Sequence, residues 1–179
     1  MHRSNLKKMI LSAMFLALGF ILPMLTGQIP ILGKALLPMH IPVLLCGFIC
    51  GTKHGAAIGF ILPIARSIIF SVPVMYPTAI AVAFEMAVYG IVTGILYQRA
   101  SRKTIPRLYL TLILAMIAGR IVRLGAEIVL LGFAGNSFVF KAFLTGVILH
   151  SVPGIFLQLI IVPMIVVATR VSHPDASGR

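Results

Sequence analysis

The sequence predicts an all-α membrane protein with six transmembrane helices. Hydrophobic residues make up 60% of the 179 residues, and the mean hydropathy is +1.10. Apolar stretches long enough to cross a bilayer, about 20 residues each, recur along the chain. A soluble domain of this size could not cover so much apolar surface. Six helices and short loops use the whole chain, so we expect one integral membrane domain over residues 1–179.

The predicted spans are apolar runs bounded by glycine, proline and basic residues. They cover residues 8–26, 39–51, 55–70, 78–98, 107–131 and 141–169. The second and third spans are interpreted as a hairpin, because residues 39–70 are too many for one crossing and Gly51–Gly55 (GTKHG) is a natural turn. The second span is short, so we expect it to be tilted, to be irregular near Pro42, or to be thinly covered by lipid.

The distribution of basic residues favours six spans over five. With six spans, ten Lys and Arg residues lie on one side of the membrane, two (Lys34 and Lys141) lie on the other, and three lie within spans. The positive-inside rule then places both termini in the cytoplasm. The net charge of +12 is explained by these basic loops and does not indicate nucleic-acid binding. The apolar N-terminal run is interpreted as a retained helix, with a cleaved signal peptide as the alternative.

Motifs for catalysis and metal binding are missing from the sequence. There is no GxxxxGK[ST] loop, no HExxH or HxxxH spacing, and no GxSxG or paired-acid motif. We therefore expect no enzyme activity, no bound metal and no cofactor in this chain. Cys46 and Cys50 are expected to be small core residues.

The functional signal comes from charged residues inside the predicted spans. Arg120, Arg123 and Glu127 share one helix face, and Arg66 and Glu85 lie in the spans before them. Three cations against two anions leave a positive charge. This predicts a pocket, open to the outside, for a small polar or anionic solute, because Arg binds carboxylates with two parallel hydrogen bonds. The alternative is that Arg123–Glu127 and Arg66–Glu85 are internal pairs that fix helix register.

Two stretches resemble the substrate-binding S components of energy-coupling factor (ECF) vitamin transporters. They are LLPMHIPVLLCGFICGTKHGAAIGFILPIARSIIF and YPTAIAVAFEMAVYGIVTGILY. The chain length, the six spans, the cytoplasmic termini and the pattern Ala13-x-x-x-Ala17 are also similar. The resemblance covers about residues 8–169 and implies an S-component-like helical bundle.

The resemblance implies capture of a micronutrient outside the cell and ATP-driven uptake. The partners would be a transmembrane coupling protein (the T component) and two ABC ATPases, so that ATP is used only by partner subunits. The small residues of the first helix, Ala13, Ala17 and Gly19, would meet the T component. The substrate-binding candidates are Lys34, Arg66, Tyr76, Glu85, Arg120, Arg123, Glu127, Asn136 and His150.

The excess of arginine favours a vitamin with a carboxylate, and pantothenate is the first expectation. Folate, niacin, biotin and pyridoxine-type compounds are the alternatives. Arg120 has no acidic residue one turn away on its own helix and is expected to contact the substrate, whereas Glu127 is expected to hold Arg123. Two other classes of function remain open: a non-transport scaffold or assembly subunit, and an autonomous secondary transporter of a small anion.

Overall fold

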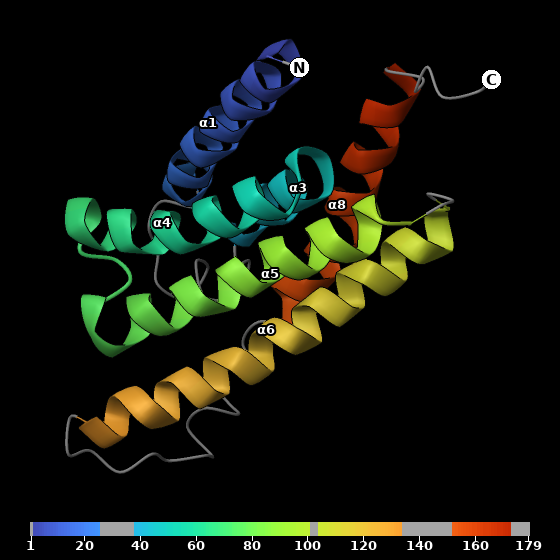
Figure 1. Ribbon diagram of the computed structural model, residues 1–179. Helices are drawn as coiled ribbons and strands as arrows, with labels where there is room; N and C mark the ends of the chain where they lie inside the picture. The colour runs from blue at the N-terminus through green and yellow to red at the C-terminus, as the bar shows by residue number, and fades with distance from the viewer. Residues whose placement is uncertain (1, 26–37, 101–103, 134–151, 173–179) are drawn as a thin grey trace.

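The computed structural model describes residues 2–25, 38–100, 104–133 and 152–172, and this part of the chain is entirely helical apart from short connections (Figure 1). Its elements are α1 (His2–Leu25), α3 (His40–Cys50), α4 (Thr52–Phe70), the π-helical turn η1 (Met75–Ala79), α5 (Ile80–Gln98), α6 (Ile105–Phe133) and α8 (Val152–Ser172). Most of residues 27–38, which connect the first two predicted spans, and the start of the span predicted for 141–169 lie outside the described residues.

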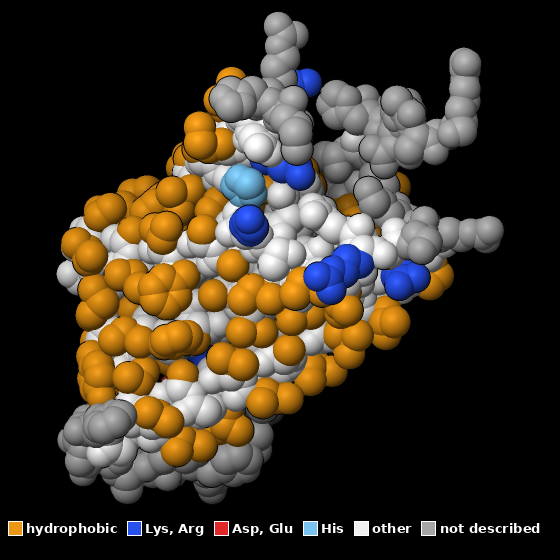
Figure 2. Space-filling model, viewed as in Figure 1, with side chains coloured by type: hydrophobic (Ala, Val, Ile, Leu, Met, Phe, Trp, Pro, Cys, Tyr) orange, Lys and Arg blue, Asp and Glu red, His pale blue; other side chains and the backbone are white. Residues whose placement is uncertain are grey.

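Four of these segments are long and apolar enough to cross a membrane: Asn5–Met24, Thr52–Phe70, Met75–Gln98 and Val152–Thr169. α6 is longer, with 29 residues, but it carries the charged cluster in its second half. Large apolar side chains cover the visible outer surface (Figure 2), and Ile68, Ile121 and Phe156 are each more than 60% exposed. Such an exterior is costly in water and suits a lipid environment.

The break between α3 and α4 confirms the predicted hairpin in place of one long helix. Gly51 has φ +98°, a conformation that side chains with a β-carbon rarely adopt, and its N–H closes the end of α3 by bonding the Cys46 carbonyl. α3 has only 11 residues, about 16 Å of helix, which is half the thickness of a bilayer core. Both cysteines are buried and free, as predicted.

Small residues bring α3, α4 and α5 into direct backbone contact. A β-carbon added at Gly55 would lie 2.8 Å from the Gly47 α-carbon, and one added at Gly90 would fall on the backbone of Gly55. Such packing holds helices together where lipid provides no hydrophobic driving force between them. It also sets the register, since Gly59 meets Met86 in the same way. The three helices therefore form a tight frame that fixes the height of Glu85 on α5.

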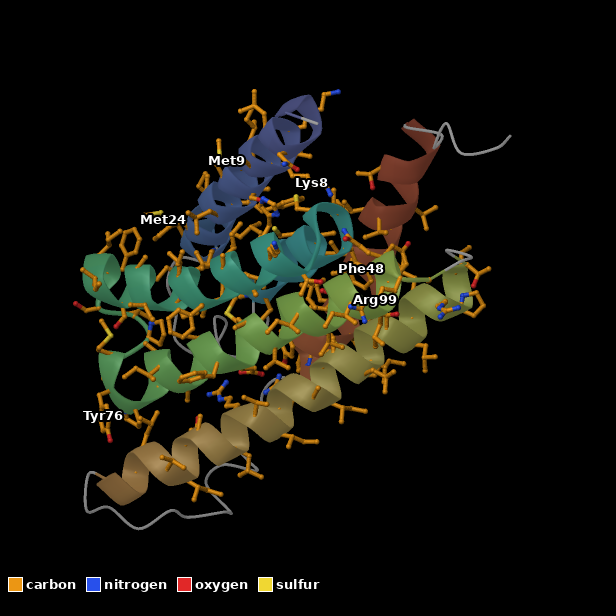
Figure 3. The ribbon with its side chains drawn as sticks, viewed as in Figure 1. Lys8, Met9, Met24, Phe48, Tyr76 and Arg99 are labelled. Carbon is orange, nitrogen blue, oxygen red and sulfur yellow. The ribbon has the colours of Figure 1, made fainter. Side chains whose placement is uncertain are left out.

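Basic residues gather at one end of the bundle. Figure 2 shows Lys, Arg and His side chains grouped there, and Figure 3 places Lys8 and Arg99 near this end and Tyr76 at the other. The start of α1, the α3–α4 turn, the end of α5 and the start of α6 all lie toward this end (Figure 1). The positive-inside rule predicts that this end faces the cytoplasm.

Candidate functional site

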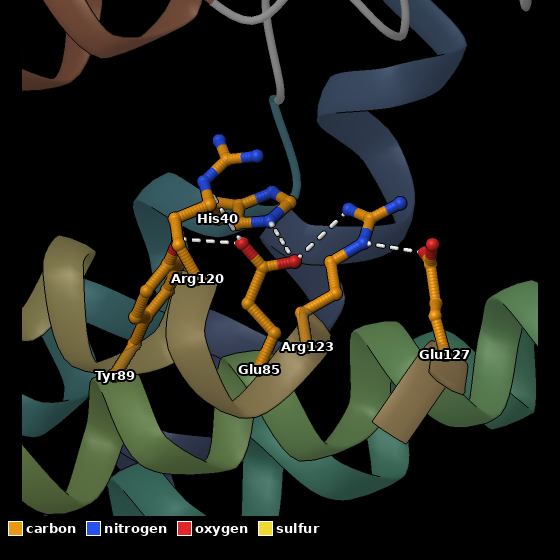
Figure 4. Close-up of polar contacts among 6 residues, drawn as sticks. All are labelled: His40, Glu85, Tyr89, Arg120, Arg123 and Glu127. Atoms are coloured by element: carbon orange, nitrogen blue, oxygen red, sulfur yellow. Dashed lines mark hydrogen bonds and ion pairs between the residues drawn. The ribbon is translucent and has the colours of Figure 1, made fainter. Parts of the chain in front are cut away.

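Glu85 is the centre of a buried ionic cluster between α5 and α6 (Figure 4). Its side chain is fully buried, and its two carboxylate oxygens contact different partners. Oε1 accepts a 2.7 Å hydrogen bond from the Tyr89 hydroxyl and lies 3.2 Å from Nε of Arg120. Oε2 accepts a 3.0 Å bond from Nη1 of Arg123 and lies 3.9 Å from Nε2 of His40. A buried carboxylate is stable only with compensation of this kind.

Arg123 bridges two carboxylates. Its Nε donates a 2.9 Å hydrogen bond to Glu127 Oε1, one turn along α6, while Nη1 reaches across to Glu85. The predicted Arg123–Glu127 pair is therefore confirmed. α6 can approach α5 this closely because Gly119 packs against the Tyr89 ring and the Glu85 backbone, where a β-carbon would clash.

The cluster is neutral as a whole, since two arginines face two glutamates. Both guanidinium groups are nearly buried, with 15% of Arg120 and 11% of Arg123 exposed. In Figure 4 both lie beyond the Glu85 carboxylate, on the side away from the α5 backbone. Each guanidinium has five N–H groups, more than its contact with Glu85 uses, and Arg123 uses one of the others for Glu127. Glu85 thus orients one arginine at each of its carboxylate oxygens without using all of their donors.

Arg66 lies apart from this cluster, and the predicted Arg66–Glu85 pair is wrong. Arg66 is 3% exposed; its Nη1 donates a 3.1 Å bond to the Phe20 carbonyl, and its guanidinium stands 5.5 Å from the centre of the Phe70 ring. The glycine contacts between α4 and α5 place Arg66 nearer the Tyr76 end of α5 than Glu85. The surplus positive charge predicted from the sequence therefore belongs to Arg66, which ties α4 to α1.

Tyr76 also lies away from Glu85, at the start of η1 (Figure 3). Its side chain is 41% exposed, and its hydroxyl donates a hydrogen bond to the Leu130 carbonyl near the end of α6. Tyr76 therefore joins η1 to α6. Lys34, Asn136 and His150, the other candidates from the sequence, lie outside the described residues.

Two residues of the cluster, His40 and Tyr89, were not among the candidates from the sequence. Tyr89 lies four residues after Glu85, a spacing that brings two side chains of one helix together, so the signal was present. His40 lies 45 residues before Glu85 and reaches it only because α3 packs beside α5. Within the described part of the chain, no group of three or more His, Cys, Asp or Glu side chains is arranged to hold a metal.

The predicted partner-binding residues of the first helix divide between two faces. Ala13 and Ala17 are exposed on α1, beside exposed Met14 and Leu18. Gly19 is buried, and its α-carbon faces the Leu62 side chain of α4, so Gly19 does not share the exposed face. Its smallness serves packing inside the bundle, whereas the two alanines lie on the exposed face of α1.

A family model described as "ECF transporter, substrate-specific component" matches residues 7–166, which is most of the chain. No curated protein and no solved structure matches it. Members of this family are substrate-binding subunits, not enzymes, and work with a T component and ABC ATPases. The helical fold, the apolar exterior and the buried charged cluster all agree with this match. The chain therefore belongs to the substrate-specific components of ECF transporters, multi-pass proteins of the bacterial plasma membrane.

Proposed function

We propose that this chain binds a small solute through a carboxylate group, with pantothenate as the first compound to test, and delivers it for ATP-driven uptake. The observation that carries the proposal is the attachment of both Arg120 and Arg123 to the single buried carboxylate of Glu85. A solute carboxylate would bind on the far side of the two guanidinium groups. Glu85 would position them, and Glu127 would hold Arg123 from its other edge.

The energetics favour a carboxylate over a neutral group at this position. A hydrogen bond to a charged group contributes about 1.5–3 kcal/mol, and the contribution is larger where water is excluded. Because Glu85 holds both arginines before the solute arrives, little side-chain freedom remains to be lost on binding. Two nearly buried arginines also repel cations, which selects against amines.

Membership of the family implies a T component and ABC ATPases as partners. The surface of this chain that contacts them is part of the proposal. The exposed strip around Ala13 and Ala17 would meet the T component, and ATP would be used only by the ABC ATPases. The basic end of the bundle would face the cytoplasm, with the cluster opening toward the opposite side. α3 is a short helix that runs beside the half of α5 nearer Gln98. Its first residue, His40, lies beside the cluster.

Purification followed by ligand identification tests the proposal. The chain is purified in detergent from cells grown in rich medium, and small molecules released on denaturation are identified by mass spectrometry. Pantothenate and pantothenol, which has an alcohol in place of the carboxylate, are then titrated by calorimetry. We expect pantothenate to bind at least 10-fold more tightly. Equal binding of acid and alcohol would refute the carboxylate site, and binding of neither would refute the proposed function.

A purely structural role is the second candidate, and the neutrality of the cluster favours it. In that case the four charges only hold α5 and α6 in register. Arg120→Gln separates the two roles, because it removes one charge and leaves the Arg123–Glu85 pair in place. A structural role predicts an unfolded or aggregated protein. A binding role predicts a folded protein whose affinity for the acid falls about 10- to 150-fold.

A further inference from the structure

His40 is a buried polar side chain without a hydrogen bond. It is the first residue of α3, only 1% of its surface is exposed, and neither ring nitrogen has a hydrogen-bond partner among the described residues. The ring is tilted against Tyr89, with centroids 5.6 Å apart. Its Nε2 lies 3.9 Å from Glu85 Oε2, too far for a hydrogen bond. An imidazole buried in this way is destabilising unless something else bonds to it.

The backbone around His40 would also favour a polar ligand atom, because N–H groups at the start of α3 point toward it. α3 begins at the level of Glu85 and Tyr89 and runs from there to the Gln98 end of α5, so its first turn lies deep in the bundle. Met39, the residue at the N-cap, makes no capping hydrogen bond with its side chain, and Pro42 removes one of the N–H groups of this turn. The remaining N–H groups form the positive end of the helix. A ligand oxygen near His40 would therefore be favoured by the ring and by the helix end.

The distance between His40 and Glu85 indicates which chemical group of a ligand could bind to both side chains. An oxygen about 2.8 Å from each of Nε2 and Oε2 would bridge the 3.9 Å gap. An ionised Glu85 only accepts hydrogen bonds, so the bridging group must donate one. A hydroxyl does this and at the same time accepts from His40 Nε2–H. An ammonium group could donate to both atoms, but Arg120 and Arg123 lie within 3.2 Å of the same carboxylate and repel a cation.

We infer that His40 and Glu85 together bind a hydroxyl group of the solute, so that the solute is a hydroxy acid. This inference rests on the proposed function, which supplies the carboxylate site beside it. A requirement for a hydroxyl group separates the candidate vitamins into those that fit the site and those that do not. Pantothenate carries hydroxyl groups next to an amide and a carboxylate at its far end, whereas nicotinate and biotin have a carboxylate and no alcohol group.

Three probes and three variants test this assignment. The probes are pantothenate, its analogue with both hydroxyls replaced by hydrogen, and pantothenol. The variants are His40→Phe, which keeps a ring, His40→Gln, which keeps a donor and an acceptor, and His54→Phe as the matched control on α4. For the wild type we expect loss of the hydroxyls to weaken binding about 10- to 100-fold. His40→Phe should lower the affinity for pantothenate by a similar factor, so that pantothenate and the analogue without hydroxyls bind equally. His40→Gln should retain part of the preference for pantothenate over that analogue. His54→Phe should bind like the wild type.

The outcomes separate this inference from the proposed function. If both acids bind wild type equally and His40→Phe changes neither, the hydroxyl site is overturned while the carboxylate site stands. If pantothenol binds as tightly as pantothenate and both weaken in His40→Phe, the hydroxyl site stands and the carboxylate site is overturned. Binding of none of the probes overturns both. Thermal unfolding of each variant shows that it is folded, and if His40→Phe does not fold, His40→Gln gives the decision.

Discussion

Removal of the charge on Glu85 should destabilise the folded chain more than any other single change in the cluster. Glu85→Gln keeps the size and shape of the side chain but leaves the two positive charges of Arg120 and Arg123 with only Glu127 to balance them. Breaking a buried ion pair by neutralising one partner costs about 3–5 kcal/mol. Since Glu85 is fully buried and contacts two arginines, we expect the upper part of this range.

Glu127→Gln is the matched control for this change. Glu127 contacts one arginine and is 14% exposed, and Arg123 would still have Glu85. We expect its loss to cost about 1 kcal/mol. Unfolding is followed by circular dichroism in detergent micelles, without ligand. For a chain of this size, a loss of 3–5 kcal/mol lowers the melting temperature by about 6–20 °C, and the control should lower it by about 2–4 °C.

The role assigned to Glu85 is refuted if the two variants melt at the same temperature, or if the melting temperature of Glu85→Gln stays within 2 °C of that of the wild type. Either result would mean that the arginines do not depend on Glu85, and that the cluster is held by contacts other than those in Figure 4. The addition of solute carboxylate provides a further check. It should stabilise Glu85→Gln more weakly than the wild type, because the arginines are no longer positioned.

Three further changes follow from the same structure. Gly90→Ala should lower stability by more than about 3 kcal/mol, since its β-carbon meets the α4 backbone, whereas Gly125→Ala, with nothing within 4 Å, should be neutral or slightly stabilising in the same melting assay. Arg66→Met should leave the affinity for the acid within threefold of the wild-type value. It should speed amide hydrogen exchange in the half of α1 that contains Phe20, because α1 loses its hydrogen bond to α4. A 10-fold loss of affinity would show instead that Arg66 contacts the solute. Replacement of Ala13 and Ala17 by Leu should preserve solute binding and block uptake by the reconstituted complex, and an equal loss of both would show that these alanines serve internal packing.

The fold could be predicted largely because apolar runs in the sequence mark the segments that cross a membrane, and basic residues mark the connections between them. Apolar runs marked the helices, and Gly51 marked the break that turns residues 39–70 into a hairpin. In a bilayer the backbone must bond to itself, so an apolar stretch of sufficient length becomes a helix almost regardless of its neighbours. Helix ends were less predictable, and α6 extends two residues beyond its predicted limits on each side.

The site could be predicted only where its members lie on one helix. The spacing of Arg123 and Glu127 on α6 gave their pair, since i and i+4 residues always share a face. Pairing between helices depends on register, which the sequence does not contain. The contact of Arg120 with Glu85, the separation of Arg66, and the approach of His40 all follow from where small residues such as Gly119 let two helices touch.

An experimental structure of the chain with pantothenate bound would show which protein groups hold the solute carboxylate. We expect that carboxylate to lie within hydrogen-bond distance of guanidinium nitrogens of both Arg120 and Arg123, with Glu85 still holding the two arginines from the other side. A carboxylate bound elsewhere, while Arg120 and Arg123 bond only to protein groups, would refute the proposed site and leave the cluster as an internal support.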